Sequence, residues 1–157
     1  MKIKTLKPNQ VLLSLEKPWF REYLQSIFEK EDDSIKINEY HDVGLIIYAN
    51  TIHTQLLKLR TYTDYTIIIT LPPCDWSAYN NRFYYVDKAA NKRINRFIQA
   101  HFNLTFAEFM YYNRNKTELT RNEIIALFHK KYLMSTESIS EETLIKKDFR
   151  KRQKMRL

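Results

Sequence analysis

The spacing of apolar residues changes from the first half of the chain to the second. The first half contains short apolar runs, alternating or β-branched, that are typical of strands; they lie at Val11–Leu15, Ser34–Tyr40 and Tyr65–Leu71. Between the first two runs, apolar residues recur at helical spacing over Pro18–Lys30, and proline is well tolerated in a first helical turn. The first half is therefore predicted to mix strands with helix.

Residues 42–60 fit two structures. A helix capped by Asp42 is favoured, because the apolar spacing of a helix continues through this segment. A strand at Gly44–Tyr48, paired with Ser34–Tyr40, is the alternative.

The connecting segments of the first half are predicted from their composition. The charged run Glu29–Asp33 is interpreted as a solvated connection, and Cys74–Asn81 as a loop after two prolines. Arg82–Val86 is predicted to be the returning strand of a hairpin.

From Asp87 onward the pattern is helical. Thr105 with Glu108, and Thr120 with Glu123, match the capping box that begins many helices, and Ser140 is a third N-cap candidate. The helices are predicted at 88–102, 106–113, 121–133 and 141–155. The fold class is therefore α+β: an N-terminal mixed α/β part (1–86), followed by a C-terminal bundle of three to four helices (87–157) ending in a helix-turn-helix-like pair.

The net charge of +8 is unevenly distributed. Residues 1–86 contain ten basic and ten acidic side chains, whereas residues 87–157 contain sixteen basic and eight acidic ones. The whole excess lies in the second part, which indicates an anionic partner there.

The last predicted helix is the main candidate for that contact. Leu144, Ile145 and Phe149 form a narrow apolar stripe that would dock on the body, so that the cations remain in solvent. Those cations are Lys146, Lys147, Arg150, Lys151, Arg152, Lys154 and Arg156. In a helix-turn-helix they would contact phosphates, with Thr143, Lys147 or Gln153 nearer the bases.

A second basic group precedes it. Lys92, Arg93 and Arg96 lie opposite the apolar stripe of their predicted helix and would extend the nucleic-acid surface. Tyr84 and Tyr85 would stack on unpaired bases, or else are half-buried strand residues, which is the commoner role.

The sequence gives no reason to expect an enzyme, a metal or a cofactor. The single glycine excludes glycine-rich phosphate loops, and the single cysteine excludes a disulfide framework and a cysteine-based zinc site. The histidines show no metal-ligand spacing, and Cys74 is interpreted as an ordinary loop cysteine. No apolar run approaches the length needed to cross a membrane, so a cytoplasmic protein is expected.

The order of these elements resembles small, uncharacterised proteins encoded by phages and mobile elements of gut bacteria. The resemblance covers about residues 34–153, and its landmarks are Ile35–Tyr40, Val43–Leu45, Ile67–Pro72, Lys92–Arg96 and Glu142–Arg152. It implies a mobile-element origin and no particular activity.

The charge pattern therefore carries the functional hypothesis. We expect a non-enzymatic accessory or regulatory protein that binds nucleic acid, with double-stranded DNA favoured, through its basic C-terminal helix. The alternative is a protein-interaction module whose basic helix docks on an acidic partner. A homodimer is compatible with either.

Overall fold

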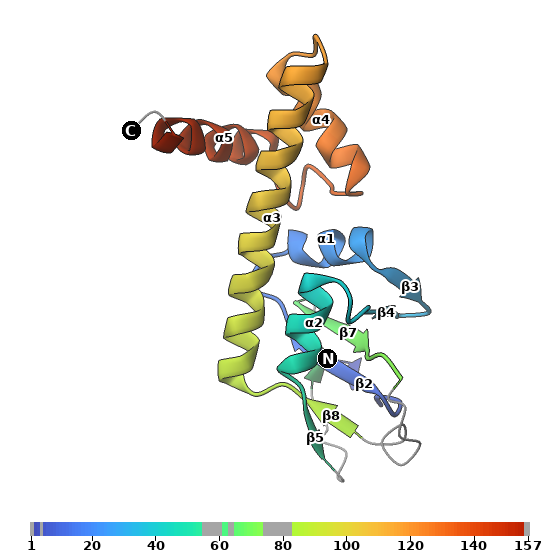
Figure 1. Cartoon of the computed structure of the whole chain (residues 1–157). Helices are drawn as coiled ribbons and strands as arrows, with labels where there is room; N and C mark the ends of the chain where they lie inside the picture. Colours follow the sequence, from blue (N-terminus) through green and yellow to red (C-terminus); the bar gives the residue numbers. More distant parts are fainter. Residues whose placement is uncertain (1, 4, 55–60, 63–64, 74–82, 156–157) are drawn as a thin grey trace.

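The computed structural model describes residues 2–3, 5–54, 61–62, 65–73 and 83–155. As predicted, the chain is α+β: a mixed α/β part with a small sheet is followed by a region of helices. Figure 1 shows the sheet at one end of the molecule, α4 and α5 at the other, and α3 running between them.

The main sheet has the strand order β2-β7-β4-β3. The predicted strands at 11–15 and 65–71 are confirmed as β2 (Gln10–Ser14) and β7 (Thr66–Thr70), which pair antiparallel. β4 (Ser34–Lys36) is shorter than predicted and runs parallel to β7. The charged run at 29–33 is exposed, as predicted, but it is not simply a connection. Its first residues form an edge strand, β3 (Glu29–Glu31), in a hairpin with β4, because an edge strand can pair while its charged side chains stay exposed.

Two strand pairs flank this sheet. β1 (Lys2–Ile3) pairs with β6 (Thr61–Tyr62), and β5 (Ile52–Thr54) pairs with β8 (Phe83–Tyr85). The strand predicted at 82–86 is thus present, but its partner is β5 rather than the preceding strand. Tyr84 and Tyr85 are half-buried on β8. Cys74–Asn81 and Arg82 lie outside the described residues.

The helix predicted across 42–60 is much shorter. α2 covers Asp42–Ala49, and β5 follows after two residues. Asn50 donates its side-chain amide to the Ile46 carbonyl (2.8 Å), and the Thr51 hydroxyl bonds the Tyr48 carbonyl (2.7 Å). These bonds satisfy the free carbonyls of a helix end, so the chain can leave the helix there. The N-cap is His41, which accepts from the Val43 N–H, and not Asp42.

Gly44 lies where α2 passes close to the backbone of Asn38, in the segment that precedes the helix. A Cβ at this position would lie 1.9 Å from the carbonyl oxygen of Asn38. The absence of a side chain is therefore what permits the close approach of the two backbones.

α3 (Lys88–Lys116) is one continuous helix of 29 residues, so the helix start predicted at Thr105 is wrong. Asp87 caps its first turn by accepting from the Ala90 N–H at 2.7 Å. Phe102, Phe106 and Met110 continue the buried stripe through the expected break. Burial of that stripe outweighs the local capping pattern, and the Thr105 hydroxyl bonds the Tyr23 hydroxyl instead, at 3.0 Å.

α3 joins the two ends of the molecule. Its first half packs on α2 and on α1 (Trp19–Ile27), and its second half packs on α4 (Arg121–Lys131) and α5 (Glu141–Met155). Buried apolar residues from both ends belong to one cluster. The boundary between 1–86 and 87–157 therefore stays a prediction.

Buried amides fix α3 to the sheet. Asn95 is 1% exposed; its amide donates to the Ser14 carbonyl (2.8 Å), and its oxygen accepts from the Glu16 N–H (2.8 Å). Asn91, one turn earlier, accepts from the Ser14 N–H at 3.1 Å. The end of β2 thus hydrogen-bonds to helix side chains, which sets the position of α3 along the sheet.

The last two helices begin where the capping signals predicted. Thr120 and Glu123 form the capping box of α4, and the Ser140 hydroxyl accepts from the Thr143 N–H at 3.2 Å to cap α5. The segment between the helices, 132–140, is longer than the turn of a standard helix-turn-helix. Glu22 of α1 holds this segment, accepting from Ser135 N–H (3.0 Å) and from the Ser138 hydroxyl.

Candidate nucleic-acid interface

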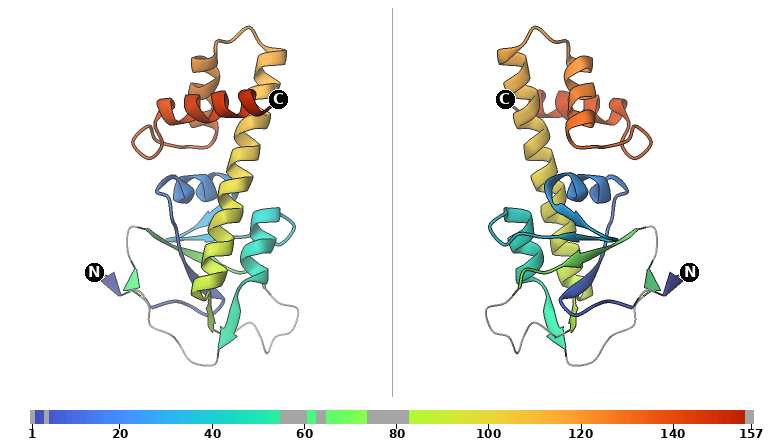
Figure 2. Two further views of the ribbon diagram at one scale, coloured as in Figure 1. Left: turned by 90° about the vertical axis from the view of Figure 1, so that its left-hand side faces the viewer. Right: turned by 90° about the vertical axis from the view of Figure 1, so that its right-hand side faces the viewer.

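α5 extends away from the body after it crosses α3. Figure 1 shows that α5 ends well to one side of α3, and Figure 2 shows α5 lying across α3. Of its described residues, only Leu144 and Asp148 are buried. The predicted apolar stripe is thus partly wrong: Phe149 is 54% exposed, and the buried position one turn after Leu144 holds a carboxylate.

Asp148 attaches α5 to α3 through one ion pair and forms a second within α5. Its Oδ2 accepts from Arg114 Nη2 of α3 at 2.6 Å and lies 3.2 Å from Arg152 Nη2, one turn further along α5. A carboxylate that is 7% exposed needs such partners, because an unpaired buried charge is strongly unfavourable. Arg152 was predicted to contact phosphates, yet its charge is largely matched within the protein. No pattern in the sequence pointed to Arg114 or Asp148.

Lys147 also makes a contact within the protein. It is half-buried, and its Nζ donates to Asn103 Oδ1 of α3 at 3.0 Å. Burial lowers the pKa of Lys147, and the charges of Arg150 and Lys17 lower it further. Lys17 precedes α1, more than a hundred residues earlier in the chain, so no sequence pattern linked it to this surface.

The remaining α5 cations face solvent. Lys146 pairs with Glu142 at 2.6 Å, a contact between two exposed side chains that contributes little. Arg150, Lys151 and Lys154 are exposed and make no ion pair or hydrogen bond within the described part of the chain. Arg156 lies outside the described residues.

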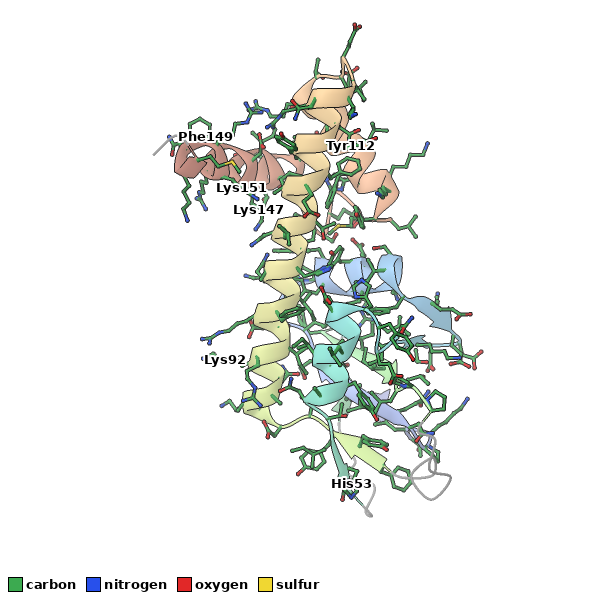
Figure 3. All side chains as sticks on the ribbon, viewed as in Figure 1. His53, Lys92, Tyr112, Lys147, Phe149 and Lys151 are labelled. Atoms are coloured by element: carbon green, nitrogen blue, oxygen red, sulfur yellow. The ribbon has the colours of Figure 1, made fainter. Side chains whose placement is uncertain are left out.

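Two cations of α3 face the same side. Lys92 and Arg96 recur with Asn103 at helical spacing, so they share the stripe of α3 that meets α5 at Lys147. Figure 3 shows Lys92 on the side of α3 from which α5 extends, with Lys147 and Lys151 on the edge of α5 toward it. Arg93 lies beside this stripe, and its Nε donates to Asn50 of α2 at 3.1 Å.

We call Lys92, Arg96, Lys147, Arg150, Lys151 and Lys154, together with Lys17, the basic face. No acidic residue occurs in α3 before Glu108. The residues between the cations of α3 and those of α5 are the neutral Gln99 and Asn103. The face therefore presents positive charge from two helices and one loop. It is electrostatically suited to an extended anion.

A groove lies between α5 and the second half of α3. Its volume is about 770 Å³, and it is lined by apolar residues of α3 and by cations of α5. Leu104 (53% exposed), Tyr111 (71%) and Met155 (73%) present apolar surface there.

Two of the histidines provide packing contacts. The fold brings His41 and His101 together, with ring centroids 5.3 Å apart, and Tyr23 hydrogen-bonds His101 Nδ1 at 2.8 Å. Burial, and then the charge of His41, lower the pKa of His101, and burial raises the pKa of Tyr23 to about 12. Among the described residues, no three His, Cys, Asp or Glu side chains are grouped closely enough to hold a metal ion.

Comparisons with protein-family models, curated proteins and solved structures gave no match. Within the described ranges, no helix has the length and apolarity required to span a membrane. The resemblance to proteins of phages and mobile elements stays an expectation.

Proposed function

We propose that this protein binds nucleic acid without catalysing a reaction, that double-stranded DNA is the favoured form, and that the basic face makes the contact. A cytoplasmic accessory or regulatory role is part of the same proposal. The observation that supports it most is the position of Lys92 on the side of α3 from which α5 extends, with Arg96 one helical turn further along. Cations distant in sequence thus face one side.

The three exposed α5 cations are suited to phosphates. Arg150, Lys151 and Lys154 lie within about a turn and a half of one helix, and none is committed to another described side chain. Long cationic side chains on a projecting helix can reach several phosphates of one duplex. Phosphate contacts of this kind supply affinity that depends on salt but not on sequence.

The test compares two variants that each lose three positive charges, one on α5 and one away from the basic face. One variant carries Arg150→Gln, Lys151→Gln and Lys154→Gln. The control carries Lys116→Gln, Arg121→Gln and Lys130→Gln, which removes three exposed cations near α4 and leaves the basic face intact. Glutamine retains helix propensity, so circular dichroism and melting should stay close to the parent in both.

We expect the first variant to lose most of its affinity for duplex DNA and the control to lose little. Three lost phosphate contacts, at about 0.9 counterion each, should reduce the slope of log K against log salt by about 2.7. Equal losses in the two variants would indicate diffuse attraction by net charge and contradict the assigned surface. Absence of binding by the parent to duplex DNA, single-stranded DNA and RNA would remove the proposal itself.

A further inference from the structure

The groove between α3 and α5 has a chemistry that phosphate binding does not require. Its floor is mainly aliphatic, with Leu104, Ala107 and Met110 from α3 and Met155 from α5. Tyr111 adds one exposed aromatic ring. Phosphates gain nothing from such a surface, and a stack of unpaired bases would need several exposed rings.

The rim of the groove is strongly cationic. Arg150, Lys151 and Lys154 line it from α5, together with the half-buried Lys147. The carboxylate of Asp148 is matched by Arg114 and Arg152, which leaves Glu108 as the one unmatched carboxylate among the lining residues described. An apolar floor inside a positive rim complements a ligand that is apolar along one stripe and negative along its edges.

We propose that the groove binds an acidic amphipathic helix of a partner protein. Amphipathic helices commonly dock in apolar grooves through anchors at i, i+3, i+4 and i+7. The exposed side chains of Leu104, Tyr111 and Met155 would receive these anchors, and the α5 cations would pair with glutamates beside them. Charge complementarity selects an acidic helix over a neutral or basic one.

The proposal goes beyond nucleic-acid binding and predicts that the acidic helix and nucleic acid compete with each other. Lys147, Arg150, Lys151 and Lys154 belong both to the basic face and to the rim of the groove. The acidic helix and DNA should therefore compete for the same cations. A partner that carried such a helix would release the protein from nucleic acid.

The experiment separates the floor from the rim. The floor variant carries Leu104→Ser and Tyr111→Ser, both at exposed positions, so folding should be retained. Its control carries Tyr112→Ser and Leu133→Ser, which are equally exposed but lie outside the groove; Figure 3 shows Tyr112 on the α4 side of α3. Probes are a panel of fluorescent helical peptides of about 16 residues, with leucine or phenylalanine anchors in varied registers and glutamate elsewhere. Matched peptides carry lysine for glutamate.

We expect at least one acidic peptide to bind the parent and the control variant, to bind the floor variant at least tenfold more weakly, and to displace duplex DNA. The floor variant should keep the DNA affinity of the parent. The proposal is overturned if no acidic peptide prefers the parent over the floor variant, or if lysine peptides bind equally well. It is also overturned if the floor variant loses DNA affinity, because nucleic acid would then occupy the groove. Binding of the parent to DNA, measured in the same assay, tests the proposed function independently.

Discussion

The sheet end of the molecule and its α5 end are held together by different means. At the sheet end, α3 is fixed by the buried side chain of Asn95, and Gly44 allows two backbone segments to touch. At the other end, α5 buries only Leu144 and Asp148 of its described residues, and Asp148 forms an ion pair with Arg114 of α3. Dense burial gives the first end its stability, whereas the exposed helix keeps its cations available to a ligand. Changes at the two ends should therefore have separable effects on stability and on binding.

Gly44→Ala should have the largest effect. The added Cβ would meet the Asn38 backbone, which cannot yield as a flexible side chain would, and such overpacking should cost about 3 kcal/mol or more. Urea denaturation measures the loss. Leu45→Ala, at the adjacent half-exposed position, is the control and should cost far less. Similar losses in both would mean that α2 does not pass so close to residue 38.

Asn95→Ala should come next. It leaves the Ser14 carbonyl and the Glu16 N–H without their partner in a buried setting, at a cost of about 2 to 3 kcal/mol. Asn103→Ala, on the exposed face of α3, is the control and should cost much less stability. Molecules of the Asn95 variant that remain folded should bind DNA as the parent does. A loss of DNA affinity without a loss of stability would contradict the separation of the two ends.

His101 should give the sheet end a dependence on pH. Because its pKa is lowered in the folded protein, the unfolded chain takes up the proton at a higher pH. Stability should thus be complete above the ordinary histidine pKa of about 6.5 and should decrease as the pH falls from there through the lowered value. Melting temperatures between pH 8 and pH 5 measure this. His101→Gln should flatten the curve; a curve parallel to that of the parent would exclude His101 as the cause.

The sequence predicted the helix starts at Thr120 and Ser140 and the strands β2 and β7, because these depend on local capping and on continuous β-branched runs. It failed at Thr105, where contacts with residues distant in sequence decide the structure. It also failed at residues 29–33, where a charged segment pairs as an edge strand with the strand that directly follows it. The distribution of charge pointed to α5 and to Lys92 and Arg96. Their common orientation could not be predicted, because it depends on the continuity of α3 and on the pairing of Asp148 with Arg114. The contribution of Lys17 depends on the same packing.

The smallest predicted effect concerns the α5 end of the molecule only, at the residues that end α4. Leu133 has φ of 52°, in the left-handed region that L side chains disfavour, and its side chain is 73% exposed. The Met134 N–H bonds the His129 carbonyl (3.0 Å) and the Leu133 N–H bonds the Lys130 carbonyl (3.4 Å), which is the Schellman arrangement that usually has glycine at this position. The left-handed conformation costs an L residue about 1 to 2 kcal/mol, whereas glycine loses about 0.5 to 1 kcal/mol more in backbone entropy on folding. Leu133→Gly should therefore stabilise the protein by about 0.5 to 1 kcal/mol.

Hydrogen exchange locates that gain. Amides near the end of α4 and the start of α5 should exchange more slowly, while those of β2 and β7 should keep the rates of the parent unless they exchange only by global unfolding. Leu127→Gly, within α4, is the opposite control and should destabilise by about 1 kcal/mol, since glycine is unfavourable inside a helix. A destabilised Leu133→Gly variant would show that the left-handed turn does not form. Slower exchange across the sheet, beyond the global gain, would show that the two ends are coupled more tightly than their contacts suggest.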